Sequence, residues 1–232
     1  MSKKRKSRAN LIIIITAAVL IVVGLSVMLF PEISNAIFEG QVEKAEQSFL
    51  QNVHDTDLDL LYRELVLRNE QIYQNGQSGL VDPFSYSKPD IDLSKYGLMD
   101  NTIGFLSIPK MEVKLPIVLG ANSDNLLKGA AHLTQTSYPV GGENTNSVLA
   151  AHRGWNRAKM FRHIELLEVG DKIYLQNFRE TLCYAVSKID IISPTDIDKL
   201  KIQKGRDMIT LVTCHPYRVN SHRYVVYCER VK

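Results

Sequence analysis

The sequence predicts a mainly β domain, an antiparallel sandwich or barrel with short connecting helices, that follows a helical region and one membrane span. Three observations predict this order. An uncharged apolar run fills residues 11–30, apolar residues recur at helical spacing between Ile33 and Tyr73, and short β-prone segments separated by turn residues recur from about Asn101.

The apolar run indicates a transmembrane helix. From Leu11 to Phe30 it has about the 20 residues that a bilayer span needs. A basic cluster precedes it, and such a cluster favours the cytoplasmic side of a membrane. The cluster consists of Lys3, Lys4, Arg5, Lys6 and Arg8. We expect a cytoplasmic tail at 1–10, a single-pass helix at 11–30 in the cell membrane, and an extracytoplasmic remainder.

A cleaved signal peptide is the alternative, because small residues follow the run at Ser34, Asn35 and Ala36. The run is longer than the usual signal core of about 7–15 residues, so the anchor is favoured. Both interpretations export the rest of the chain.

The charge balance argues against a nucleic-acid partner. The whole chain carries a net charge of +3, but five of its 28 basic residues precede the apolar run, leaving 23 against 25 acidic residues. A nucleic-acid binder needs a basic face on its folded part, and this balance gives no sign of one.

Residues 31–75 are predicted to be helical. Val42, Ala45, Phe49 and Val53 recur at helical spacing. A second series follows, and it consists of Leu58, Leu61, Leu65 and Ile72. We expect two short helices that rise from the membrane and pack on the main domain, with Asp55 or Thr56 as the N-cap of the second. Residues 76–95 then form an irregular loop.

Residues 96–232 are predicted to form the β domain. Glycine pairs and other turn residues separate most of its β-prone segments, which favours an antiparallel arrangement. The segments are Ile103–Ile108, Val113–Val118, Ser147–Ala151, Lys172–Phe178, Leu182–Ile192, Met208–Thr213 and Arg223–Arg230.

Three residues at predicted strand ends suit acyl transfer. Cys214 ends an apolar strand, Arg223 opens the next one, and His152 follows another strand before a glycine turn. If the two later strands pair as a hairpin, Cys214 and Arg223 lie near the same end. A thiolate can attack a peptide carbonyl, an imidazole can protonate the departing amine, and a guanidinium can face the developing oxyanion. The Arg223 charge also favours the thiolate form of Cys214.

The sequence motifs around these residues resemble those of the sortase family. Thr210–Cys214 matches the TLxTC signature, and residues 214–223 look like the class C segment that joins the catalytic Cys to the catalytic Arg. Tyr138–Gly142, followed by His152–Gly154, resembles the class C lead-in to the catalytic His. The tripeptide Asp82, Pro83 and Phe84 resembles the lid motif of that class.

The resemblance implies a sortase-type closed β-barrel and a cysteine transpeptidase with His152, Cys214 and Arg223 as catalytic residues. Such enzymes cleave an LPxTG-like sorting signal after its Thr and hold the acyl group on Cys. Class C members pass it to a lysine amine of another pilin subunit. The partners implied are pilin or surface proteins that carry the signal, with no cofactor.

The sequence departs from the family pattern at several points outside the triad. Ala151 stands where Gly commonly precedes the His, and Cys228 stands where the last strand often has Gly. Many class C members also continue into a second membrane helix, whereas this sequence ends at Lys232.

Other interpretations stay open. A sortase that anchors proteins to the cell wall is the alternative enzyme, and a non-enzymatic surface adhesin is the alternative of another class. A zinc site lacks any short paired ligand spacing, so no metal is expected. We expect surface positions for the remaining histidines and free buried thiols for Cys183 and Cys228, unless those two pair. These histidines are His54, His132, His163, His215 and His222.

Overall fold

The computed structural model describes residues 2–55, 58–154 and 158–231. Eight strands close into one barrel in the order β1-β2-β3-β4-β7-β8-β6-β5. The strands are β1 Thr102–Ile108, β2 Val113–Leu119, β3 Ala130–His132, β4 Thr145–Ala150, β5 Lys172–Asn177, β6 Thr181–Ile192, β7 Asp207–His215 and β8 His222–Arg230. This closed barrel confirms the predicted fold class.

The barrel is mixed rather than wholly antiparallel, which corrects the sequence expectation. β2 pairs with β3 in parallel, and β4 pairs with β7 in parallel. Parallel neighbours need a crossover connection, and the helix α3 (Ser123–Lys128) supplies it between β2 and β3. β3 itself was not among the predicted strands, because its three residues carry too little β pattern to detect.

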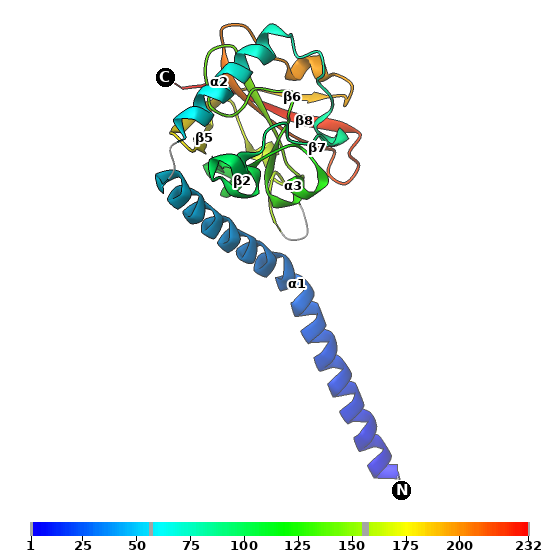
Figure 1. Cartoon of the computed structure of the whole chain (residues 1–232). Coiled ribbons are helices and arrows are strands. Elements are labelled where there is room, and N and C mark those ends of the chain that lie inside the picture. The colour runs from blue at the N-terminus through cyan, green and yellow to red at the C-terminus, as the bar shows by residue number, and fades with distance from the viewer. Residues whose placement is uncertain (1, 56–57, 155–157, 232) are drawn as a thin grey trace.

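The helical region also differs from the expectation. One helix, α1 (Ser2–Asp55), contains both the apolar run and the first predicted short helix, with Pro31 inside it. In Figure 1 it projects from the barrel and carries the N-terminus at its far end. By length and composition, it is able to cross a membrane.

The second helix, α2 (Asp59–Gln74), begins later than predicted. Its N-cap position is Leu58, which has no capping side chain; Asp55 ends α1, and Thr56 lies outside the described residues. Asp59 places a carboxylate in the first turn, where its negative charge interacts favourably with the helix dipole. Leu61 and Leu65 are fully buried and join the barrel core, so α2 is part of the packed domain.

Short 3-10 helices fill several connections. They are Pro83–Ser85, Leu93–Tyr96, Met99–Asn101, Pro109–Met111, Ile164–Leu166 and Ile197–Leu200. The first of them packs Phe84 against a second apolar cluster that includes Leu80, Val212 and Val225. This packing places the 82–86 segment over the ends of β7 and β8.

Candidate active site

Cys214 and Arg223 face each other across the antiparallel pair β7 and β8. They are register partners, one pair before the His215–His222 pair that closes the ladder. The two strands therefore pair as the sequence predicts. Cys214 is half-buried and Arg223 is buried, so the thiol and the guanidinium share one sheltered barrel rim.

His152 lies beside the same strand end. β4 runs parallel to β7 with Ala150 opposite Val212. The Ala151 N–H then donates to the Val212 carbonyl at 3.2 Å. Continuing this register by two residues puts His152 alongside Cys214. The three candidate residues therefore meet at one rim of the barrel, from strands that are neighbours in the order β4-β7-β8.

The two threonines of the TLxTC signature link β7 to the His152 side. The Thr210 hydroxyl donates to Asn146 Oδ1 at 2.8 Å, and the Thr213 hydroxyl donates to the Ala151 carbonyl at 2.7 Å. Both threonines are fully buried. A buried hydroxyl needs a partner, so each threonine fixes the spacing of β7 against the segment that leads to His152.

Asp82 holds the Arg223 guanidinium from outside the barrel. Arg223 Nε donates to Asp82 Oδ1 at 2.7 Å, and Nη2 donates to Oδ2 at 2.8 Å. The remaining nitrogen, Nη1, donates to the Asn220 and His222 carbonyls at 3.1 and 3.0 Å. Every guanidinium nitrogen is therefore occupied in this conformation.

Phe84 covers the same rim. The Arg223 guanidinium carbon lies 5.0 Å from the centre of the Phe84 ring, and that ring lies 6.4 Å from the His152 ring, centre to centre. Pro83, between the two contact residues, is buried. The 82–84 tripeptide thus touches two of the three candidate catalytic residues.

Hydrogen bonds shape the start of the 82–88 segment and attach its end to neighbouring loops. At its start, Asp82 Oδ2 accepts from the Phe84 N–H at 3.2 Å. At its end, the Ser87 N–H donates to the Ala121 carbonyl at 2.9 Å, and the Thr134 hydroxyl donates to the Lys88 carbonyl at 2.8 Å. The bonds of Ser87 and Lys88 hold the end of this segment against the barrel domain.

Burial favours the neutral forms of Cys214 and His152 in this conformation. It raises the pKa of the Cys214 thiol; the Arg223 charge opposes this shift and the Asp82 charge adds to it. Burial also lowers the pKa of His152. The Arg223 charge does lower the pKa of Cys214, as expected. Its effect is outweighed here by burial and by the carboxylate.

The other histidines and cysteines divide between surface and core. His163 and His222 are exposed, as expected. His132 is buried, which corrects the surface expectation: its ring stacks on Tyr138 at 5.3 Å, and burial lowers its pKa to about 4. Cys183 and Cys228 are both free, and Cys228 lies opposite Val186 rather than Cys183. Cys228 is buried as expected, whereas Cys183 is half-buried.

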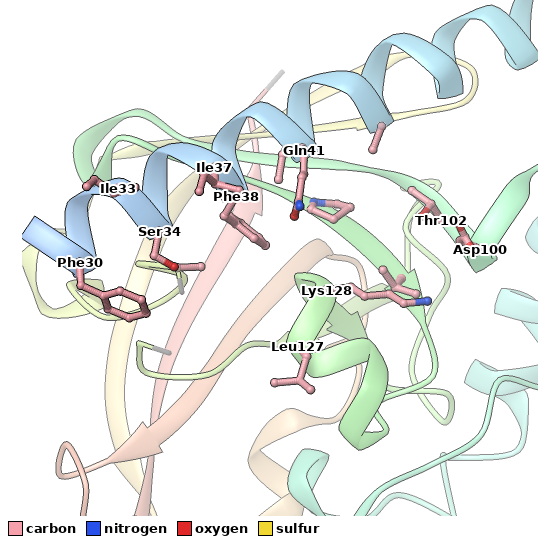
Figure 2. A pocket seen from close by; sticks show the side chains of 15 residues that line it. Phe30, Ile33, Ser34, Ile37, Phe38, Gln41, Asp100, Thr102, Leu127 and Lys128 are labelled. Atoms are coloured by element: carbon pink, nitrogen blue, oxygen red, sulfur yellow. The ribbon is translucent and has the colours of Figure 1, made fainter. Parts of the chain in front are cut away.

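A separate groove lies between α1 and the barrel. Figure 2 shows this groove, which has a volume of about 840 Å³. Phe30, Ile33 and Ile37 line it from α1, and Leu127 and Lys128 line it from α3. His152, Cys214 and Arg223 do not line it, so it is distinct from the candidate active site.

Two side chains to which the sequence assigned no functional role lie next to His152 and Cys214, and one of them, His215, is half-buried rather than exposed as expected. Arg153 follows His152, His215 follows Cys214, and the two side chains are in contact. Their position beside the motif residues was visible in the sequence. Their contact was not, because it depends on the parallel pairing of β4 and β7.

Comparison with known proteins identifies similar sequences and structures. The family model described as "Sortase domain" matches residues 106–231. The chain is 33% identical over 158 residues to Sortase A of Bacillus anthracis, which covers 66% of this chain and 72% of that protein. It is 34% identical over 131 residues to Sortase D of Bacillus subtilis, which covers 55% of this chain and 63% of that protein.

The solved structures match a larger share of the chain than these two sequences do. Sortase C1 of GBS pilus island 1 has a TM-score of 0.73 and 32% identity, covering 82% of this chain and 98% of that one. Streptococcus pneumoniae sortase C has a TM-score of 0.73 and 33% identity, with coverage of 82% and 97%. Sortase C-1 from Actinomyces oris has a TM-score of 0.64 and 37% identity, with coverage of 74% and 98%.

Proposed function

This chain belongs to the sortase family of transpeptidases, and from that premise we propose that it polymerises pilin subunits through a Cys214 thioester. The solved structures it resembles are class C sortases, one of them from a pilus island. The observation that carries the proposal is the convergence of Cys214, Arg223 and His152 at one barrel rim.

The proposed reaction has two steps. His152 takes the proton of the Cys214 thiol, and the thiolate attacks the Thr carbonyl of an LPxTG-like signal. The bond from that carbonyl to the next nitrogen breaks, and His152 returns its proton to the departing amine. A lysine amine of another subunit then attacks the thioester and loses a proton to His152. The thiolate leaves, and an isopeptide bond remains.

Arg223 is proposed to stabilise the oxyanion that forms in both steps. A guanidinium stays charged and offers fixed donors to the developing charge. In the closed conformation those donors are bonded to Asp82 and to two carbonyls. The Asp82, Pro83 and Phe84 segment is therefore proposed as a lid that must move before substrate reaches Arg223.

We propose a membrane location for the enzyme as well. The long apolar part of α1 supports a single-pass anchor, and the basic residues before it support a cytoplasmic N-terminus. The proposed division is a tail at 1–10, a membrane helix at 11–30, a helical region at 31–75, a lid loop at 76–95 and an extracytoplasmic catalytic domain at 96–232.

A cell-wall anchoring sortase is the second candidate, because Sortase A of Bacillus anthracis matches 66% of the chain. The two candidate functions differ in the amine that accepts the acyl group. Full-length protein in detergent is incubated with an LPxTG-like peptide and either a lysine-containing pilin segment or a cell-wall peptide, and the products are identified by mass spectrometry. Preference for the cell-wall amine contradicts the pilin assignment.

The same experiment with Cys214→Ala tests the mechanism. The wild type should form an adduct heavier by the acyl fragment of the peptide, and Cys214→Ala should form none while keeping its fold. An adduct on Cys214→Ala contradicts the nucleophile. Absence of any cleavage by the wild type with every signal peptide contradicts the function itself.

A further inference from the structure

The residues that flank His152 in the sequence contact the residues that flank Cys214. One such contact precedes the two residues along the chain and one follows them. Before the pair, the Thr213 hydroxyl donates to the Ala151 carbonyl at 2.7 Å. After the pair, Arg153 Nη1 lies 2.5 Å from His215 Nδ1. The two candidate catalytic residues are thus bracketed by two direct contacts between the β4 side and the β7 side.

The Arg153 side chain is held in place by its surroundings. It is only 10% exposed, and its Nη2 donates to Glu165 Oε2 at 3.0 Å. Its guanidinium carbon lies 5.5 Å from the centre of the Tyr224 ring. The His215 ring lies 5.7 Å from the same ring, so Arg153 and His215 share one aromatic support.

The contact defines the protonation state of His215. A guanidinium has donors and no acceptor, so His215 Nδ1 must offer its lone pair, and the ring proton then sits on Nε2. Burial lowers the pKa of His215, and the charges of Arg153 and His222 lower it further while Glu165 opposes them. A neutral ring is the form that this contact needs.

These contacts concern the loop that bears His152. β4 ends at Ala150 and β7 ends at His215, so His152 lies beyond the last ladder position of its own strand. The Arg153–His215 contact extends the connection between the two strands past the ladder. Proton transfer depends steeply on geometry, and a displacement of about 1 Å can cost roughly 10²-fold in rate.

We propose that Arg153 and His215 form a positioning pair that holds His152 beside Cys214 for proton transfer to the departing amine. This inference rests on the proposed transpeptidase function. Neither side chain touches the reacting atoms in this role. Both act through the residues that precede them.

The proposal makes a distinction that a purely structural role does not. His152 takes the Cys214 proton with either substrate. Only a peptide amide also needs a proton on its departing nitrogen, because a thioester releases a thiolate that needs none. Loss of the positioning pair should therefore slow the amide substrate much more than the thioester of the same sequence.

The test uses the full chain in detergent micelles with an LPxTG-like peptide amide and its thioester analogue. Arg153→Met should lower kcat on the amide by roughly 10²-fold with little change in KM, and should lower kcat on the thioester far less. Arg206→Met is the matched control, because Arg206 makes an exposed ion pair of 2.7 Å with Glu229 near the opposite ends of β7 and β8. It should leave both rates unchanged.

Two His215 variants keep the proposal testable if Arg153→Met does not fold. His215→Asn retains an acceptor oxygen near the Nδ1 position and should keep most of the wild-type activity on the amide. His215→Leu removes the acceptor and should behave as Arg153→Met does. Cys214→Ala supplies the background rate for the thioester.

The possible outcomes distinguish failure of the positioning pair from failure of the proposed function. Equal losses on amide and thioester in folded variants, or equal activity of His215→Asn and His215→Leu, overturn the positioning pair. A wild type that processes neither substrate overturns the proposed function instead.

Discussion

Arg223 binds the Asp82 carboxylate through two nitrogens, at 2.7 and 2.8 Å, with both side chains close to nine-tenths buried. An exposed ion pair of this kind contributes only about 0–1 kcal/mol to stability. Burial changes that estimate, because removing one partner of a buried pair leaves an uncompensated charge. The closed conformation is therefore fixed by the ion pair as well as by Phe84.

The first prediction concerns opening of the proposed lid. Asp82→Ala combined with Phe84→Ala removes the ion pair and an aromatic contact that contributes about 1.5–3 kcal/mol when fully buried. The rate at which a thiol reagent modifies Cys214 should rise about tenfold or more, since each 1.4 kcal/mol is a factor of ten. Hydrolysis of a small signal peptide should also speed up.

Tyr86→Ala is the control for this experiment, because Tyr86 belongs to the same segment but is 60% exposed. It should leave the modification rate unchanged. Unaltered rates in the folded double variant mean that residues 82–84 are a static connector.

A second prediction follows from the raised pKa of Cys214. In the closed protein, the rate of alkylation should keep increasing above the pH of about 8.5 at which an ordinary thiol titrates. Asp82→Ala removes a carboxylate that raises this pKa and releases the Arg223 charge that lowers it. The midpoint should therefore move to lower pH. Alkylation rates measured from pH 6 to 10 check this, and a midpoint shifted upward contradicts the charge assignment.

The third prediction separates the two roles of Arg223. Arg223→Lys keeps the charge but loses the planar pair of donors that Asp82 binds. Thiol modification should become faster because the segment opens, while transpeptidation should fall by about 10²–10³-fold because the oxyanion donor is lost. Arg218→Lys, on the exposed loop between β7 and β8, should change neither rate. Near-wild-type turnover of Arg223→Lys refutes the oxyanion role.

The fourth prediction identifies the histidine that moves protons. His152→Ala should abolish turnover of the peptide amide and leave the fold intact. His222→Ala should remain active, because His222 is exposed and its Nδ1 contacts the Ser221 hydroxyl at 2.9 Å. Turnover by both variants is measured on the same peptide. The reverse pattern of activity assigns the proton transfer to His222.

The β7 and β8 arrangement was predictable because it is local. Consecutive strands joined by a short turn usually pair, so the ends of β7 and β8 meet and bring Cys214 to Arg223. The parallel pair of β4 and β7 was not predictable in this way, because two other strands separate them along the chain. His152 was therefore identified by its resemblance to a motif and not by its place in the barrel.

Burial of His132 shows a second limit of the sequence. Its neighbours Ala130, Ala131 and Leu133 are apolar, but they do not show to which side the His132 ring points. In the structure His132 Nε2 lies 2.9 Å from the Ser137 carbonyl and 3.4 Å from the Thr136 hydroxyl. These partners come from a loop that folds back on β3. Side chains that depend on such tertiary partners have no local periodicity that would predict them.

The last prediction concerns the attachment of α2 to the barrel. Asn69 is buried, accepts from the Tyr138 N–H at 2.7 Å and donates to the Tyr138 carbonyl at 3.2 Å. Asn69→Ala leaves both buried groups without this partner, which should cost about 1–3 kcal/mol. Thermal unfolding in detergent should show Tm lower by about 2–4 °C per kcal/mol. The exposed neighbour Glu70→Ala should stay within about 0.5 kcal/mol of the wild type. Equal Tm values for the two variants mean that Asn69 does not hold α2 to the loop that leads toward His152.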